Sequence, residues 1–84
     1  TGSAVLNFPN TLAQTSSDLT IAVTGAAVGD AVSLGVNPTA VTANTCYTAW
    51  VSAADVVTVR HNNYSALASN PASATFKVEV LKNA

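Results

Sequence analysis

Apolar and polar residues alternate one by one along four stretches of this chain. The stretches are "DLTIAVT" (18–24), "DAVSLGV" (30–36), "DVVTVRH" (55–61) and "ATFKVEVLK" (74–82). A period of two places successive side chains on opposite faces of a β-strand. The pattern therefore predicts four strands whose buried faces carry Leu19, Ile21, Val23, Val32, Leu34, Val36, Val57, Val59, His61, Phe76, Val78 and Val80.

Two further strands are expected from weaker patterns. Residues 45–53 ("TCYTAWVSA") place aromatic rings on both faces, Tyr47 on one and Trp50 on the other, so the pattern leaves the buried face open. An opening strand is expected near residues 4–8. Asn, Pro and Gly separate the runs, as they do in turns. About six short strands predict a single all-β domain over residues 1–84, a small antiparallel β-sandwich or barrel.

The stretch "TGAAVGDAVSLG" (24–35) carries two glycines four residues apart. A phosphate-binding loop needs a Lys after its last glycine, whereas Asp30 follows Gly29 here. A membrane-helix contact of this spacing needs an apolar helix of about 20 residues, and the chain has no such apolar run. We therefore expect a strand-to-strand connection. In it Gly25 and Gly29 adopt positive φ and the Asp30 side chain accepts a hydrogen bond from a turn N–H.

The composition limits the partners. Only 8% of the residues are charged, against roughly 25% in a typical soluble domain. Three basic residues and a net charge of −1 cannot form the basic surface that nucleic acid requires, so no nucleic-acid partner is expected. The lack of a long apolar run likewise predicts no membrane span and no membrane partner. A surface with few charges provides little electrostatic repulsion between molecules. The composition therefore favours self-association of the chain.

The residues that support catalysis or metal binding are few. His61 is the only histidine and is expected to form a local hydrogen bond near a strand end, while Cys46, the only cysteine, is expected to be a small buried side chain. A Cys46–His61 pair remains arithmetically possible, although no orienting acid accompanies it in the sequence. Asp18, Asp30 and Asp55 each begin an alternating run, where aspartate caps backbone N–H groups. We expect no enzymatic activity, metal or cofactor.

Binding of a protein partner or a ligand at the surface is the remaining function that the sequence supports. Trp and Tyr are enriched at interface anchors and at sugar-stacking platforms. Arg60 lies out of phase with the expected core and stands close to the sequence "NNY". The candidate interface or ligand-contact residues are therefore Trp50, Arg60, Asn62, Asn63 and Tyr64.

Three segments of the chain resemble a small β-domain of tailed-bacteriophage virion proteins: "SSDLTIAVTGAAVGDAVSLG", "YTAWVSAADVVTVRHNNYS" and "NPASATFKVEVLK". In that family a strand leads into a Gly-Ala-x-x-Gly-Asp turn, a Val-Ser-Ala-Ala-Asp hairpin follows, and the last strand opens after Asn-Pro-Ala-Ser. The resemblance runs from Phe8 to Lys82. Ala74 stands where the family usually has glycine, so that turn is expected to differ slightly.

The resemblance implies a noncatalytic structural protein on the surface of the phage particle, of the capsid-decoration (cement) or head-fibre type. Homotrimers are the common assembly among such parts, and phage capsid or fibre proteins are the implied partners. The family has no catalytic residues to carry over. The alternative is a host-surface or glycan-binding tip domain of a phage tail fibre, with Trp50 or Tyr64 stacking on sugar.

Overall fold

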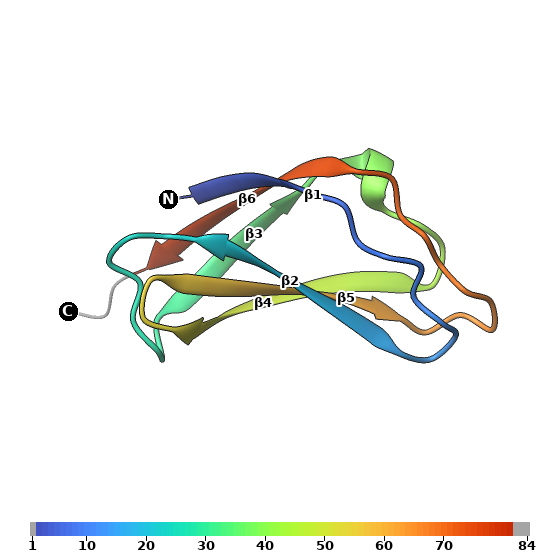
Figure 1. The fold of residues 1–84 in the computed structure, drawn as a ribbon, viewed down its shortest axis with the longest axis horizontal. Coiled ribbons are helices and arrows are strands. Elements are labelled where there is room, and N and C mark those ends of the chain that lie inside the picture. The colour runs from blue at the N-terminus through green and yellow to red at the C-terminus, as the bar shows by residue number, and fades with distance from the viewer. Residues whose placement is uncertain (1, 82–84) are drawn as a thin grey trace.

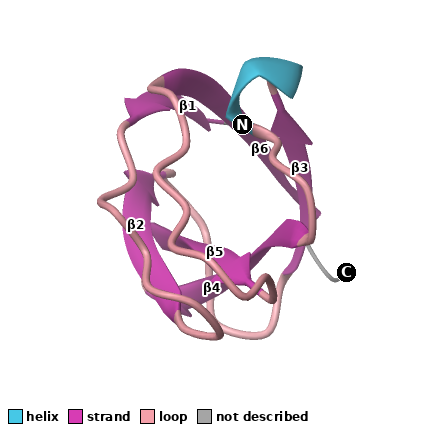
Figure 2. Cartoon of the chain, turned by 90° about the vertical axis from the view of Figure 1, so that its right-hand side faces the viewer, coloured by secondary structure: helices cyan, strands magenta, loops and turns pink. Residues whose placement is uncertain are grey.

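The computed structural model describes residues 2–81, which form an all-β sandwich. Two three-stranded antiparallel sheets, in the orders β1–β6–β3 and β2–β5–β4, face each other across the interior (Figures 1 and 2). The expected fold class, a small antiparallel β-sandwich or barrel of about six strands, is confirmed, and the two separate sheets make it a sandwich. The elements are β1 (Gly2–Leu6), β2 (Ser16–Ala22), β3 (Ala31–Val36), the 3-10 turn η1 (Pro38–Ala40), β4 (Thr45–Ala53), β5 (Val56–Asn63) and β6 (Ala74–Leu81).

The connections mostly cross from one sheet to the other. The expected connection between β2 and β3 is confirmed: Gly25 and Gly29 have φ of 91° and 98°, and the Asp30 carboxylate accepts a hydrogen bond from the Ala27 N–H at 3.1 Å. Among the described strands, only β4 and β5 are joined as a hairpin. Its turn contains Asp55, at φ 64°, whose carboxylate accepts a hydrogen bond from the Gly25 N–H at 2.7 Å. The two turns therefore hold each other at one end of the molecule (Figure 1).

The buried face follows the predicted alternation on the strands at the centres of the sheets. Val57 and Val59 on β5 and Phe76 on β6 have no solvent exposure, and Ile21 on the neighbouring β2 is 2% exposed. The inward residues of β3 are only partly buried, because β3 is an edge strand of its sheet. Alternation thus identified the correct face in all four alternating runs, and position within the sheet decided how deeply that face is covered.

An aromatic cluster fills the interior at the middle of the sandwich. The Tyr47 side chain points inward from β4, so the face of this strand that carries Tyr47 is the buried one and the face that carries Trp50 is the outer one. The ring centre of Tyr47 lies 5.0 Å from that of Phe76 and 5.5 Å from that of Phe8. Its hydroxyl donates a hydrogen bond to the Ala40 carbonyl oxygen at 2.7 Å, and burial raises the pKa of the phenol. The cluster thereby connects β4, β6 and the segments that follow β1 and β3.

The first strand lies two residues earlier than expected, and Phe8 belongs to the segment after it. The ring of Phe8 is nevertheless 1% exposed, because the chain turns inward after β1. At the start of β1, a Cβ atom on Gly2 would lie 2.8 Å from Cγ2 of Val23. This close approach brings β1 against the end of β2, and a larger residue would force the two sheets apart there.

Candidate functional site

The outward side chains of β2, β5 and β4 form one continuous surface, here called the outer face. The strand register places Asp18, Arg60 and Thr48 in one row and Thr20, Thr58 and Trp50 in the next. Asp18 and Arg60 are the only charged residues of this sheet that face outward. The remaining outward residues are small or uncharged: Ser16, Thr20, Ala22, Cys46, Thr48, Trp50, Ser52, Val56, Thr58 and Asn62.

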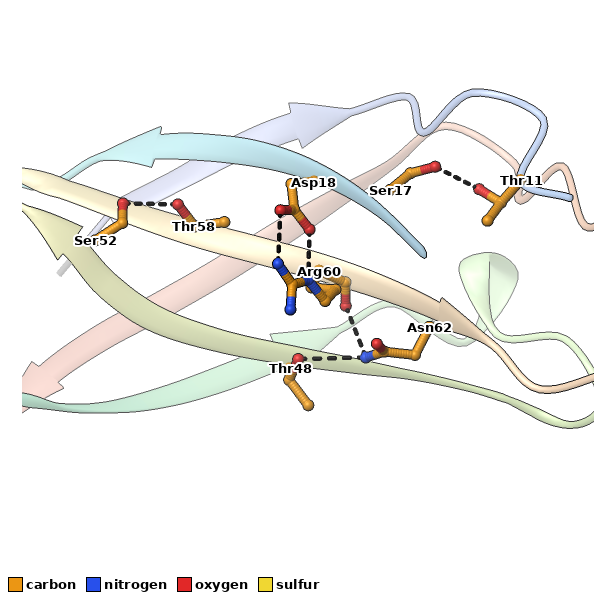
Figure 3. Close-up of polar contacts among 8 residues, drawn as sticks. All are labelled: Thr11, Ser17, Asp18, Thr48, Ser52, Thr58, Arg60 and Asn62. Carbon is orange, nitrogen blue, oxygen red and sulfur yellow. Dashed lines mark hydrogen bonds and ion pairs between the residues drawn. The ribbon is translucent and has the colours of Figure 1, made fainter. Parts of the chain in front are cut away.

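Arg60 lies at the centre of the outer face, where two neighbouring side chains contact it. Its Nε and Nη2 atoms donate hydrogen bonds to the two carboxylate oxygens of Asp18, at 2.8 and 3.0 Å (Figure 3). The guanidinium carbon lies 4.7 Å from the centre of the Trp50 ring, within cation–π range. The hydrogen bond from Arg60 holds the pKa of the Asp18 carboxyl below its usual value. The pair neutralises itself and presents a preordered, weakly charged centre.

Asn62 and Tyr64 extend this surface towards the end of β5. The Asn62 amide donates to Oγ1 of Thr48 at 3.3 Å (Figure 3). Tyr64 is 67% exposed, and an interaction with the Cys46 thiol raises the pKa of its hydroxyl. Cys46 is therefore an exposed outer-face residue, and the expectation of a buried cysteine is wrong. The strand turns Tyr47 inward, so its neighbour Cys46 must face out.

Asn63, expected among the surface contacts, lies on the inner side of β5 and is 1% exposed. Its amide nitrogen donates to the carbonyl oxygens of Thr11, Leu12 and Leu67 at 3.1, 3.3 and 2.9 Å. Its amide oxygen accepts from the backbone N–H and the hydroxyl of Ser65. The structure thus brings Trp50, Arg60, Asn62 and Tyr64 to one side of the sheet and makes Asn63 the anchor of two loops.

His61 is buried, as its place in the alternation predicts, but the expected local hydrogen bond is not formed. It has no solvent exposure, and neither ring nitrogen has a hydrogen-bond partner among residues 2–81. Its ring centre lies 4.9 Å from that of Tyr47 and 5.8 Å from that of Phe8. Burial lowers the pKa of the imidazole, because these aromatic surroundings disfavour its charged form.

We predict that the fold loses stability as the pH falls below about 6.5, the ordinary pKa of histidine. In that range the unfolded chain binds a proton at His61 that the folded chain does not, because the folded pKa is lowered. The free energy of unfolding is then expected to fall by up to about 1.4 kcal/mol per pH unit. Urea unfolding at pH 7, 6 and 5, followed by Trp50 fluorescence, measures this slope. In the control, His61→Leu, the stability should be flat over this range, and an equal slope in both proteins would contradict the assignment.

The geometry excludes the catalytic pair that the sequence left open. Cys46 faces outward and His61 faces inward, on opposite sides of the same sheet. Asp18 is not a turn cap as expected but lies inside β2, paired with a residue 42 positions away. Nothing in the sequence pattern points to that pairing, since it depends on the register of β2 against β5. No cluster of three potential metal-binding side chains occurs among the described residues.

No helix within residues 2–81 is long and apolar enough to cross a membrane. The outer face is the candidate recognition surface: it is weakly charged and carries an aromatic ring beside an arginine that is paired with Asp18. Comparison with protein-family models, with curated proteins and with solved structures finds no significant match for this chain.

Proposed function

We propose that this protein is a noncatalytic bacteriophage virion structural protein that assembles with copies of itself, as a trimer, on the surface of the phage particle. The capsid-decoration or head-fibre role rests on the sequence resemblance. The observation that supports assembly is the centre of the outer face, where Asp18 clamps Arg60 against Trp50. Rigid Trp and Arg side chains are the residues that most often dominate binding energy at protein interfaces.

The charge distribution supports the same proposal. Burying an unpaired charge at an interface is costly, whereas a charge that already has its partner can be covered at a lower cost. Arg60 carries its own counter-ion in Asp18, and the surrounding Ser, Thr and Ala side chains carry no charge. A neighbouring subunit or capsid protein can therefore pack on this face through shape, apolar contact and uncharged hydrogen bonds.

Sedimentation of the purified protein tests self-association. We expect a species of three times the 8.4 kDa chain mass at micromolar concentration. Trp50→Ala is expected to weaken assembly at least tenfold, as interface anchors do. Lys77→Ala, an exposed position on the other sheet, serves as the matched control and should assemble as the wild type does. A wild-type monomer under these conditions would reject the assembly proposal.

The virion location has its own test. Purified particles of the phage that encodes the chain are expected to contain it in a fixed ratio to the major capsid protein, as measured by quantitative mass spectrometry. Particles that lack the protein would exclude a structural role in the virion, whatever its state of assembly in solution.

The alternative, a glycan-binding domain at a fibre tip, draws support from the exposed ring of Tyr64. Trp50 supports it less, because the guanidinium of Arg60 already covers one face of that ring. Glycan-array binding that is present in the wild type and lost in Tyr64→Ala would favour this alternative over a purely structural role.

A further inference from the structure

The outer face is too small to hold a stable assembly by itself. Its three strands contain seven to nine residues each. At about 3.3 Å per residue and about 4.8 Å between strands, they cover a flat outline of about 380 Å². Stable interfaces bury about 800 Å² on each partner. The self-association proposed above therefore needs a second contact surface next to this one.

The uncharged loop end of the molecule supplies such a surface. Three segments, 7–15, 37–44 and 64–73, meet at the end that lies opposite the β4–β5 turn, and we call this end the tip (Figure 1). None of these segments contains Asp, Glu, Lys or Arg. Large apolar side chains are exposed on them: Leu12 at 65%, Val41 at 55%, Tyr64 at 67% and Leu67 at 76%. Through Tyr64 and its neighbour Cys46 the tip is continuous with the outer face.

The tip is held in place by hydrogen bonds that run from loop to loop. Ser69 exchanges backbone hydrogen bonds with Thr11 at 2.7 and 2.8 Å, and its hydroxyl lies 3.2 Å from that of Thr42. The Tyr64 N–H donates to the Asn44 carbonyl oxygen at 3.0 Å. Segment 64–73 therefore lies between the other two. A surface ordered in this way loses little conformational entropy when it binds.

The tip also carries an exposed apolar side chain, Leu12, and a groove that Leu12 does not line. A groove of about 520 Å³ is lined by Thr42, Ala43, Asn44 and residues 65–70, which is within the size range of pockets that accept small groups. Leu12 belongs to the segment on the other side of 64–73. A ring of identical subunits requires this arrangement, since each copy must offer two different, complementary surfaces to its two neighbours.

We propose that the tip binds a second copy of this chain, with the Leu12 side chain of one subunit entering the groove of the next. The contact rests on the proposed self-association and specifies which surfaces complete it. Both surfaces are uncharged, so no ion is desolvated when they meet. The contact is head to tail, so it does not end at a dimer, and it forms a ring where the rotation between successive subunits closes.

Charge placed on either side of the contact tests the proposal. Leu12→Glu places a negative charge on the side chain that would enter the groove. Ala68→Lys places a positive charge in the groove lining. Each is expected to weaken assembly at least tenfold in sedimentation at micromolar concentration. The double variant Leu12→Glu/Ala68→Lys is expected to recover assembly, because the two new charges face each other across the contact. Val28→Glu is the matched control, since Val28 is 72% exposed in the connection between β2 and β3, away from the tip.

The outcomes separate this contact from the broader proposal. If Trp50→Ala dissociates the assembly while Leu12→Glu behaves like Val28→Glu, a second copy does not occupy the tip and the inference is overturned, although self-association stands. If the wild type is monomeric, both fail. Circular dichroism of each variant confirms that the fold persists, so a loss of assembly can be assigned to the contact itself.

Discussion

Asn63→Asp is expected to destabilise the fold by about 3–4 kcal/mol, although the two side chains have nearly the same shape. The Asn63 amide nitrogen donates to three carbonyl oxygens in two loops. A carboxylate cannot donate to them, and it would place a negative charge against their oxygen atoms in a site that is 1% exposed. Urea or thermal unfolding of the variant measures the loss.

The neighbouring residue supplies the matched control. Asn62 faces outward, and its amide makes only long hydrogen bonds of 3.3 and 3.5 Å, to Thr48 and to the Arg60 carbonyl oxygen. Asn62→Asp makes the same chemical change one position away, and it is expected to shift stability by less than about 1 kcal/mol. Equal unfolding midpoints for the two variants would refute the role assigned to Asn63.

Phe76→Ala is expected to cost about 3–5 kcal/mol, a large part of the total stability of a domain of this size. The Phe76 ring has no solvent exposure and packs edge-on against Phe8 and Tyr47, with ring centres 5.6 and 5.0 Å away. Removing the ring leaves a cavity between the two sheets, and the surrounding structure closes such a cavity only in part. A loss of about 3 kcal/mol lowers the melting temperature of such a small domain by more than about 10 °C, which differential scanning calorimetry detects.

Tyr64→Ala controls for the removal of an aromatic ring in general. Tyr64 is 67% exposed, and we expect its loss to change stability by about 0.5 kcal/mol or less. If Phe76→Ala melts within a few degrees of Tyr64→Ala, the aromatic cluster does not hold the sheets together as described.

The inward and outward faces of β2, β3, β5 and β6 were predictable because they depend on local alternation alone, whereas that of β4 was not, because it carries a large ring on each face. Ile21, Val57 and Phe76 lie in the core as their spacing requires. The order of the strands within each sheet was not predictable, because it depends on pairings between distant residues such as Asp18 opposite Arg60. Backbone conformation was predictable only where residue type restricts it, as at Gly25 and Gly29.

The candidate site was predictable in part for the same reason. Trp50, Arg60 and Asn62 share a face because β4 and β5 form a local hairpin in register, and Arg60 was expected to face outward. Asn63 was predicted to be exposed together with these residues, because a polar residue next to a loop is usually exposed. The sequence contains no sign that three carbonyl groups would gather around its amide. The burial of His61 followed from its phase, but its lack of hydrogen-bond partners depends on how Phe8 and Tyr47 enclose it.

The pairing of β1 with β6, in which Gly2 stands opposite Val78, sets the order in which the protein can fold. β6 is the central strand of its sheet, so neither β1 nor β3 has a hydrogen-bonded neighbour there until β6 arrives. The β4–β5 hairpin is local and closes quickly, whereas pairings between distant segments are slow. β6 is the last of the six strands in the chain, so the sheet β1–β6–β3 cannot form before β6 has been synthesised. The strand that brings Phe76 into the core is thus also the strand that completes the second sheet.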